Sequence, residues 1–596
     1  MKNSPKKSRV LANNFYALRW LLRISPGFTL YRMLDGIVGS VIILFEHVYL
    51  VAFVISCIEN NRPLRDALWF IIPVTAGIVI RFVIGYFVDS YIQPKKKEHI
   101  NREIQFALYR KAVGMDIQKY DNPDFYNDFV WAMREAPAHL EEARNNIGDL
   151  VRVILITALV GTFVIANDPV SVAVILVMVV ITLFSRFRLN KLQMERLNKI
   201  VPEKRKRDYI HRVFYLADYA KELRTSEIKE KLYDDFDEAS AAMESHVTEY
   251  GKKLTLLSYV TNVVQKVLTM DGIYLSYLLY QTFVRQSFGY GTLIALYNSS
   301  RNLKGSIEGL VEMGPRFQNQ SMYIERLRTF LDAENELKDE GTAVVPDVGD
   351  ISLDNVSFAY PGSDTKILKN ISLHIRKGEK IALVGYNGAG KSTLVKLLMR
   401  LYDPSEGVVC YDNLPLGDYP LAELRKHFGV VFQESEVIAA SLAENITMSG
   451  APIDAERALQ ALEKSGFRER FESFENGFET RLTKEFDNQG VNLSGGEAQK
   501  VALSRTLYSD SSVLILDEPS SALDPVAEYR INQTMLHIAE DKTVVIITHR
   551  LSTTKFVDKI YMMEDGRIVE SGSHDSLMEL GGKYAEMFNL QAAKYR

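Results

Sequence analysis

Six long apolar segments occupy the first half of the chain and predict membrane-spanning helices. They lie at residues 29–58, 66–92, 147–167, 169–187, 254–284 and 290–315. Each is long enough for the roughly 20 residues with which a helix crosses the hydrocarbon core. Segment 290–315 is the most polar, since it contains Arg301, Lys304 and Glu308. We retain it because an even number of spans returns the chain to the side on which it entered.

Basic residues near the ends of these segments predict their orientation. Lys95, Lys96 and Lys97 follow the second segment, and a basic run that includes Arg186 and Arg188 follows the fourth. Lysine and arginine accumulate on the cytoplasmic side of membrane proteins. The short turns near 59–65, 167–169 and 285–289 are therefore expected outside, and both termini in the cytoplasm.

Two long charged loops, 93–146 and 188–253, separate the spans on the cytoplasmic side. Their helical pattern predicts that spans two to five extend well beyond the membrane, by roughly 30 Å for every 20 residues. Residues 121–128 and 214–222 are expected to reverse the chain in each loop. Their aromatic side chains are suited to docking on another domain; the alternative is packing within the loop.

Ionisable side chains inside the predicted spans allow two interpretations. Such residues are costly in lipid, so they line a polar path or pair with one another. The sequence leaves both interpretations open for Asp35, Glu46, His47, Arg81, Lys266, Asp271, Arg301, Lys304 and Glu308.

The N-terminal segment and the overall composition limit the remaining possibilities. Residues 11–27 mix aromatic and apolar side chains with Arg19 and Arg23, which predicts an amphipathic helix in the membrane interface; a soluble helix packed on the domain is the alternative. The net charge of −4 gives no support for a nucleic-acid partner. The two cysteines, Cys57 and Cys410, are too far apart in sequence to indicate a structural disulfide or zinc site.

The second half contains a phosphate-binding loop at Gly385–Thr393. An apolar strand, 381–384, precedes it, and a helical pattern, 394–399, follows. Strand, glycine-rich turn and helix are the context expected of a P-loop. The backbone of such a loop and the positive end of the following helix bind phosphate. The residues expected to bind nucleotide are Gly385, Asn387, Gly388, Gly390, Lys391, Ser392 and Thr393, with Lys391 on the β- and γ-phosphates and the Ser392 hydroxyl on Mg²⁺.

Two further apolar strands end in residues suited to phosphate chemistry. Strand 512–516 leads to Asp517, a ligand for Mg²⁺, and to Glu518, a general base for the attacking water. Strand 543–548 leads to His549, which we expect at the ligand-binding edge of a parallel sheet.

A second anion-binding element follows at Leu493–Glu497, which we call the signature stretch. Its residues Ser494, Gly495, Gly496 and Glu497 open a helix. Backbone N–H groups at such a helix start bind phosphate. One chain therefore carries two different phosphate cradles.

Together these motifs resemble those of the ATP-binding-cassette (ABC) exporter half-transporters, and the resemblance covers the whole chain. It implies ATP and Mg²⁺ as ligands, with Tyr360 stacking on adenine and Gln433 both sensing Mg²⁺ and contacting the membrane domain. It implies that Glu518, His549 and Gln433 are the catalytic residues. It implies that Ser392, Gln433 and Asp517 bind the metal ion, and that residues 521–524 are the D-loop. In this family each ATP lies between the P-loop of one subunit and the signature stretch of another, so the resemblance implies a dimer.

The expected organisation follows from these patterns. Residues 1–27 form a cytoplasmic tail and interfacial helix, 28–320 an all-α domain of six spans, 321–348 a linker, and 349–596 an α/β P-loop nucleotide-binding domain. One departure from the family stands at Thr483–Gly490, where many exporters carry a T-x-V-G-E segment. A homodimer and a heterodimer both remain open.

The function expected is export of a hydrophobic or amphipathic substrate across the cytoplasmic membrane, driven by ATP hydrolysis and alternating access. An ATP-gated channel or sensor with the same architecture is the main alternative, and a soluble ATPase of translation or DNA repair conflicts with the apolar segments. Peptides, lipids and drug-like amphiphiles all remain open as substrates.

Overall fold

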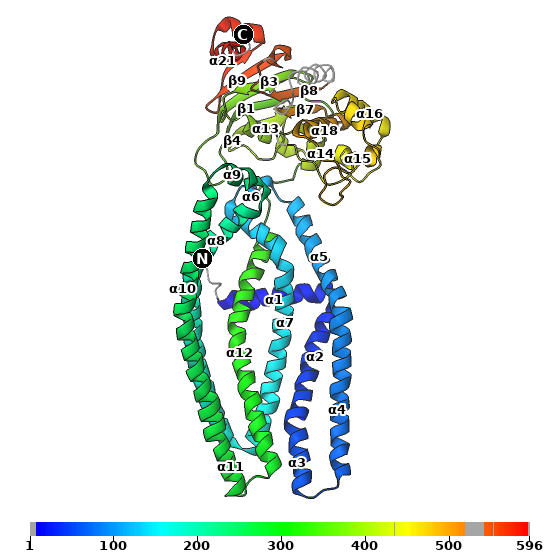
Figure 1. The fold of residues 1–596 in the computed structure, drawn as a ribbon. Helices are drawn as coiled ribbons and strands as arrows, with labels where there is room; N and C mark the ends of the chain where they lie inside the picture. The colour runs from blue at the N-terminus through cyan, green and yellow to red at the C-terminus, as the bar shows by residue number, and fades with distance from the viewer. Residues whose placement is uncertain (1–6, 434, 519–541, 552, 594–596) are drawn as a thin grey trace. The chain divides into compact units, whose positions relative to one another are not determined.

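The computed structural model describes residues 7–433, 435–518, 542–551 and 553–593 (Figure 1). The chain forms two compact units. The first contains Met1–Ala112 and Asp128–Asp332, and the second contains Val113–Asn127 and Ala333–Arg596. A short stretch of the loop between the second and third predicted spans thus belongs to the same unit as the predicted phosphate-binding loop.

The first unit is entirely helical. Its elements up to the first loop are α1 (Lys7–Ile24), α2 (Pro26–Leu44), η1 (Phe45–Leu50), α3 (Val51–Glu59), α4 (Leu64–Phe87), η2 (Val88–Ile92) and α5 (Gln93–Val113). The remainder are α7 (Pro123–Asn167), α8 (Pro169–Tyr215), η3 (Ala217–Tyr219), α9 (Ala220–Thr225), α10 (Ile228–Asn262), η4 (Val263–Tyr274), α11 (Leu275–Phe283) and α12 (Tyr290–Leu331). Helix α8 has 47 residues, which corresponds to a length of about 70 Å. This confirms the prediction that the helices extend well beyond their apolar parts.

Four helical stretches are long and apolar enough to cross a membrane, and they match the first four predicted spans. They are Pro26–Glu59, Leu64–Val113, Phe125–Asn167 and Pro169–Tyr215, as found among the residues that the structure describes. The chain is therefore a multi-pass membrane protein by length and composition of its helices. The six-span count, which also needs segments 254–284 and 290–315, stays a prediction.

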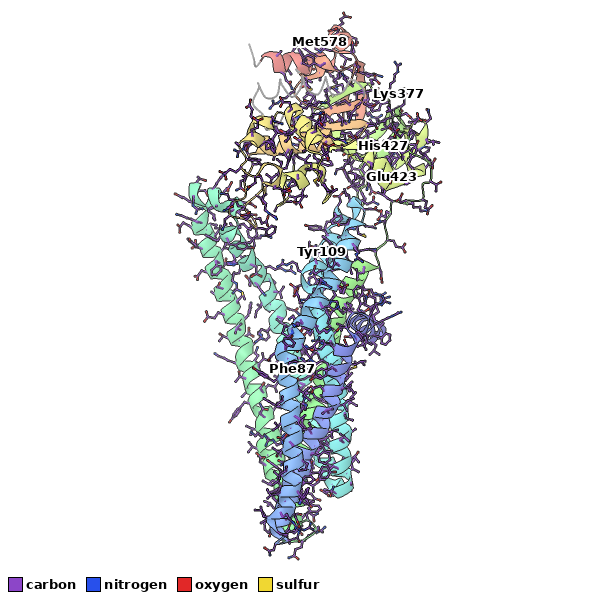
Figure 2. The ribbon with its side chains drawn as sticks, turned by 90° about the vertical axis from the view of Figure 1, so that its right-hand side faces the viewer. Phe87, Tyr109, Lys377, Glu423, His427 and Met578 are labelled. Carbon is purple, nitrogen blue, oxygen red and sulfur yellow. The ribbon has the colours of Figure 1, made fainter. Side chains whose placement is uncertain are left out.

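Helix α4 exposes an unusual amount of apolar surface. Trp69 is 74% exposed, Phe82 76% and Phe87 54%, and Phe87 is labelled on this helix in Figure 2. Large exposed apolar areas on a protein mark a contact with another protein or with lipid. Because α4 lies within a stretch long and apolar enough to cross a membrane, these side chains suit contact with lipid or with another membrane helix.

Several ionisable residues inside the predicted spans have polar partners. Arg81 forms an ion pair with Asp35 at 3.2 Å, and Lys304 lies 3.7 Å from Glu308. The Tyr297 hydroxyl donates to Asp271 at 2.6 Å. For these residues the structure favours local pairing, which lowers the cost of placing charge at this depth.

Helix α1 packs along α12 through one of its faces. Asn13 is fully buried and donates from Nδ2 to the Ser321 carbonyl at 3.2 Å and to Ser321 Oγ at 3.0 Å. On the other side of the helix, Leu11 and Phe15 are 79% and 68% exposed. The helix is thus attached to the bundle and still presents an apolar face, so its predicted interfacial position remains compatible with its packing.

The chain reverses twice between the long helices. The first reversal lies at 114–122, around α6 (Ile117–Tyr120), earlier than most of the predicted 121–128 stretch, because Pro123 starts α7. Proline suits the first turn of a helix, whose N–H groups lack partners in any case. Asn122 caps this helix by accepting a hydrogen bond from Phe125 N at 3.2 Å. The second reversal, at η3 and α9, confirms the prediction for 214–222.

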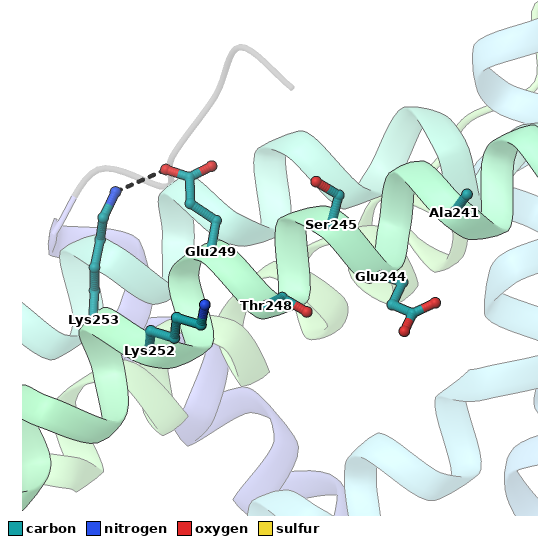
Figure 3. Close-up of a pocket in the computed structure, with 7 residues that line it drawn as sticks. All are labelled: Ala241, Glu244, Ser245, Thr248, Glu249, Lys252 and Lys253. Atoms are coloured by element: carbon teal, nitrogen blue, oxygen red, sulfur yellow. Dashed lines mark hydrogen bonds and ion pairs between the residues drawn. The ribbon is translucent and has the colours of Figure 1, made fainter.

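A hollow with a volume of about 680 Å³ opens along one face of α10 (Figure 3). Its lining comes from this helix alone and consists of Ala241, Glu244, Ser245, Thr248, Glu249, Lys252 and Lys253. Glu249 accepts from Lys253 at 2.7 Å. The lining carries charges of both signs, so its charge favours neither a cation nor an anion as a ligand.

The second unit is an α/β domain built on two sheets. Among the described residues, the larger sheet has six strands, in the order β10 (Arg567–Gly572), β9 (Lys559–Glu564), β3 (Lys380–Gly385), β8 (Thr543–Ile547), β7 (Val513–Asp517) and β6 (Phe428–Val431). All its neighbours pair in parallel except β10 with β9. The antiparallel sheet has the order β2 (Leu368–Ile375), β1 (Ile351–Phe358), β4 (Glu406–Tyr411) and β5 (Leu414–Pro415). The sequence predicts one strand before the phosphate loop, one before Asp517 and one before His549, and all three are present as β3, β7 and β8.

Helices complete this unit. They are α6, α13 (Lys391–Leu398), η5 (Leu416–Asp418), α14 (Leu421–Lys426), α15 (Leu442–Thr447), α16 (Ala455–Lys464), α17 (Arg468–Glu472), η6 (Gly477–Glu479), α18 (Gly495–Tyr508), η7 (Thr553–Phe556), α20 (His574–Leu580) and α21 (Lys583–Ala592). Figure 2 locates four residues of this unit, namely Lys377, Glu423, His427 and Met578.

Candidate functional site

Three parallel strands bring the predicted phosphate-binding residues to one edge of the sheet. Asp517 at the end of β7 pairs with Ile547 of β8, and Ile547 pairs with Leu383 of β3. Gly385 and His549 each follow these positions by two residues. The end of β3, Asp517 and His549 therefore meet at the carboxyl edge, where ligands of open α/β sheets bind.

Glycine is required at the start of the phosphate loop. Gly385 has φ +148°, and a Cβ there would lie 2.2 Å from the Met563 carbonyl oxygen. Gly388 and Gly390 also have positive φ, of +81° and +100°. The loop ends at Gly390, directly before α13. This backbone is the compact strand–loop–helix turn that the sequence predicts.

Lys391 is held inside this loop. It is 7% exposed, and its Nζ donates to the carbonyl oxygens of Gly385 at 2.8 Å and Tyr386 at 3.1 Å. Burial lowers the pKa of Lys391, while the charges of Glu518 and Asp517 act in the opposite direction. An ammonium group that is partly desolvated and held by neutral carbonyls gains strongly from an anionic partner.

Asp517 has the properties of a cation ligand. It is 7% exposed, it accepts a hydrogen bond from the Ser392 side chain, and its Oδ1 is buried without a hydrogen-bond partner in the described part of the chain. Burial raises the pKa of Asp517. The Ser392 hydroxyl and the Asp517 carboxylate are oxygen donors of the kind that Mg²⁺ selects, so these residues fit that ion. The described residues contain no group of three or more His, Cys, Asp or Glu that could hold a metal, and the remaining ligands would have to be water and phosphate oxygens.

Glu518 and His549 face each other at the same edge. His549 Nδ1 lies 2.9 Å from Glu518 Oε1. Glu518 has φ +51°, a conformation that a residue with a side chain adopts only when its surroundings hold it. Its N–H donates to the Ile547 carbonyl at 3.0 Å, and its own carbonyl accepts from Gln499 Nε2 at 3.0 Å. The carboxylate thus projects from a fixed backbone.

Two glutamines support this pair and were not singled out from the sequence. Gln499 lies on α18 and is 3% exposed. Gln591 on α21 accepts from Leu551 N at 3.0 Å and donates to the carbonyl of His549. Only the position of Gln499, two residues after the signature stretch, offered a signal in the sequence.

Tyr360 is attached to the phosphate-loop helix. Its hydroxyl lies 3.1 Å from Thr393 Oγ1 and accepts from Lys396 Nζ at 3.3 Å. The rings of Phe358 and Tyr402 pack edge-to-face against it, with centroids at 5.1 and 5.5 Å. Tyr360 is half-buried, so part of its surface stays available to a ligand beside the loop.

The remaining predicted residues are not part of this cluster. Gln433 is exposed, two residues beyond the end of β6. Ser494 and Glu497 form a capping box at the start of α18, and no hydrogen bond or ion pair joins them to the phosphate loop among the residues described. Asn387 is exposed within the loop. The predicted D-loop, 521–524, lies outside the described residues.

The atypical stretch Thr483–Gly490 forms a closed loop. Thr483 N donates to the Val491 carbonyl at 2.9 Å, and Gly490 N donates to the Asp487 carbonyl at 2.9 Å. Phe486 in this loop is 81% exposed. The loop therefore presents an aromatic side chain at the surface just ahead of the signature stretch.

Parts of this chain are similar to known proteins. Residues 368–521 match the family model described as "ABC transporter". The chain is 34% identical over 344 residues to the ATP-dependent lipid A-core flippase of Escherichia coli (strain K12), covering 57% of this chain and 58% of that protein. It is 32% identical over 353 residues to the ATP-dependent lipid A-core flippase of Aliivibrio fischeri (strain ATCC 700601 / ES114), covering 58% and 59%. The chain thus matches somewhat more than half the length of these curated relatives.

Proposed function

We propose that this chain, whose residues 368–521 match the ABC transporter family model, is one half of an exporter driven by ATP hydrolysis. The observation that carries the proposal is the meeting of the phosphate loop, Asp517, Glu518 and His549 at one sheet edge. A separate unit of the same chain supplies helices able to span a membrane. Hydrolysis and translocation are thereby combined in one polypeptide.

The residues at the sheet edge have distinct roles in ATP hydrolysis. Lys391 leaves the loop carbonyls to bind the β- and γ-phosphates, and the loop backbone surrounds them. Glu518 accepts a proton from water as the water oxygen bonds to the γ-phosphorus, and the bond from that phosphorus to the β–γ bridging oxygen breaks, giving ADP and phosphate. His549 orients Glu518 and donates to the γ-phosphate. Mg²⁺, held by Ser392 and Asp517 together with water and phosphate oxygens, would neutralise charge on the phosphates.

The signature stretch completes the site from a second subunit. Ser494–Glu497 opens α18, a 14-residue helix whose first N–H groups suit a phosphate. Because this helix start is separate from the phosphate loop within one chain, we propose that two chains pair so that each signature stretch covers the partner's nucleotide. Closure of this dimer and its reopening after hydrolysis drive alternating access.

The substrate proposed is a lipid-like amphiphile, and the site of action is the cytoplasmic membrane with both termini in the cytoplasm. The similarity to two proteins named lipid A-core flippases supports the lipid class. The basic residues that follow the second and fourth predicted spans support the orientation.

The test uses the full chain in sealed phospholipid vesicles with the nucleotide-binding unit outside. ATP is expected to drive a headgroup-labelled lipid out of the exposed leaflet, as measured by chemical quenching of the label. Glu518→Gln is expected to bind ATP normally but to abolish both phosphate release and lipid movement. Lipid movement that proceeds equally without ATP, or in Glu518→Gln, would overturn the proposal.

A further inference from the structure

Residues 113–127 are bound to the nucleotide-binding unit by several polar contacts. Asp116 Oδ2 accepts from the backbone N–H groups of Glu336 at 2.6 Å and Leu337 at 2.9 Å. Lys119 forms an ion pair with Glu336. These contacts attach the segment to the region just ahead of β1, and they explain why it belongs to this unit.

One contact of the segment reaches deeper into the unit. The Tyr402 hydroxyl donates to a carboxylate oxygen of Asp121. Tyr402 is only 1% exposed. Burial raises the pKa of Tyr402, and the neighbouring negative charge of Asp121 raises it further, so the hydroxyl remains a donor at every physiological pH. A buried hydroxyl that loses its acceptor is costly, which ties the position of the Tyr402 ring to Asp121.

The Tyr402 ring in turn borders Tyr360. The two rings meet edge-to-face at 89°, with centroids 5.5 Å apart. The opposite end of Tyr360 is bound by Thr393 and Lys396 of α13. The orientation of Tyr360 is therefore set by α13 at its hydroxyl and, at its ring, by Tyr402 together with Phe358.

We infer that Tyr402 and Asp121 are positioning residues for Tyr360, so that residues 113–127 set the affinity of the site for the base of the nucleotide. The inference rests on the proposed role of Tyr360 in stacking on adenine. A ring held at the correct angle loses less entropy when the base stacks on it, so ATP binds more tightly. By linkage, binding of the base strengthens the attachment of residues 113–127 to the same degree.

The test compares two ligands that differ in the base. Binding of ATP and of inorganic tripolyphosphate to the full-length protein in detergent is measured by calorimetry with Mg²⁺ present. Tyr402→Phe removes the hydroxyl and keeps the ring, and Asp121→Ala removes the acceptor. Each is expected to weaken ATP binding three- to tenfold and to leave the affinity for tripolyphosphate unchanged.

Two control variants separate this inference from the proposed function. Lys119→Met breaks another contact of the same segment without touching a tyrosine, and it is expected to change neither affinity. Tyr360→Ala is expected to weaken ATP binding selectively, and Asp121→Ala should add nothing to its effect. If Tyr360→Ala leaves both affinities unchanged, the adenine role fails. The positioning role is overturned if Tyr360→Ala weakens ATP binding selectively but Tyr402→Phe and Asp121→Ala do not. It is also overturned if Tyr402→Phe and Asp121→Ala weaken the binding of ATP and tripolyphosphate equally.

Discussion

The Asp517 carboxylate is a buried charge that a bound cation would stabilise. It is buried, and one of its oxygens has no hydrogen-bond partner in the described structure. Its pKa is raised in the folded chain by burial. The folded protein therefore binds more protons than the unfolded chain between the ordinary pKa of about 4 and the raised one, and its free energy of unfolding falls as the pH rises through this window.

We predict that Asp517→Asn removes this loss of stability. Without nucleotide and Mg²⁺, the variant should melt about 2 °C above the wild-type protein at neutral pH, with the difference shrinking as the pH falls toward 4. Thermal unfolding of both proteins across this pH range measures the difference. A difference independent of pH would contradict the assignment.

Gln499 is predicted to act on hydrolysis through Glu518. Gln499→Ala removes one of the two hydrogen bonds that hold the Glu518 backbone, at a cost of about 1 kcal/mol. We expect kcat for ATP to fall roughly fivefold with little change in KM.

The matched control for Gln499 is Ser504→Ala on the same helix. Ser504 is also buried, but within the described structure its hydroxyl interacts with Ser465 Oγ at 2.7 Å and with the Lys500 carbonyl at 2.9 Å, and not with the Glu518 backbone. Ser504→Ala should keep normal kcat, and equal losses in both variants would show that α18 matters only for stability.

Individual residues differ in how far the sequence alone identifies them. Lys391, Asp517 and His549 follow apolar strands, so strand pairing alone predicts that they meet. Tyr402 and Gln591 make their contacts across 281 and 42 residues of sequence. No local pattern encodes such contacts, because they depend on how the elements pack.

At the scale of elements, the phosphate loop depends on the backbone of its first glycine. We predict that Gly385→Ala abolishes ATP binding and destabilises the protein by several kcal/mol, because the added Cβ would overlap the Met563 carbonyl on β9. Nucleotide binding and thermal unfolding measure the two effects.

Gly378 provides the comparison for Gly385. It has φ +75°, yet a Cβ there meets no atom within 4 Å. Gly378→Ala should therefore cost only about 1 kcal/mol of strain and preserve ATP binding. If both variants retained ATP binding, the fit of β3 against β9 would not control the loop.

The predicted membrane spans differ in how well the hydropathy of the sequence supports them. Segments 147–167 and 169–187 contain long apolar runs, and their helices qualify as spans. Segment 254–284 contains the π-helical η4, and polar residues interrupt α12 in segment 290–315. Hydropathy measures only transfer to lipid, so it does not test whether a segment with paired polar side chains, such as Lys304 and Glu308, crosses the membrane.

At the scale of the whole molecule, the proposed pairing of two chains is testable by disulfide trapping. Cys57 and Cys410 are first replaced by alanine, and cysteines are then introduced as Asn387→Cys and Ser494→Cys. In the Glu518→Gln background, ATP should produce a cross-linked dimer on a non-reducing gel, whereas ADP should not.

The outcome also distinguishes the two kinds of dimer. Cross-linking that needs both cysteines and ATP supports a homodimer with the phosphate loop opposite the signature stretch. Protein that stays monomeric under these conditions would exclude that pairing and leave the heterodimer.

The shared membership of residues 113–127 and 333–596 in one unit has a consequence for biogenesis. Asp116 and its partner Glu336 are 220 residues apart, so a ribosome working at 5–20 residues per second separates them by roughly 10 to 45 s. During that interval the Asp116 carboxylate lacks the backbone N–H groups of Glu336 and Leu337, because these residues have not yet been made. The later unit can then dock only after translation has passed the last helix. A recombinant fragment beginning at residue 333 would lack this segment, so the Tyr402 hydroxyl would lose Asp121, the acceptor of its hydrogen bond.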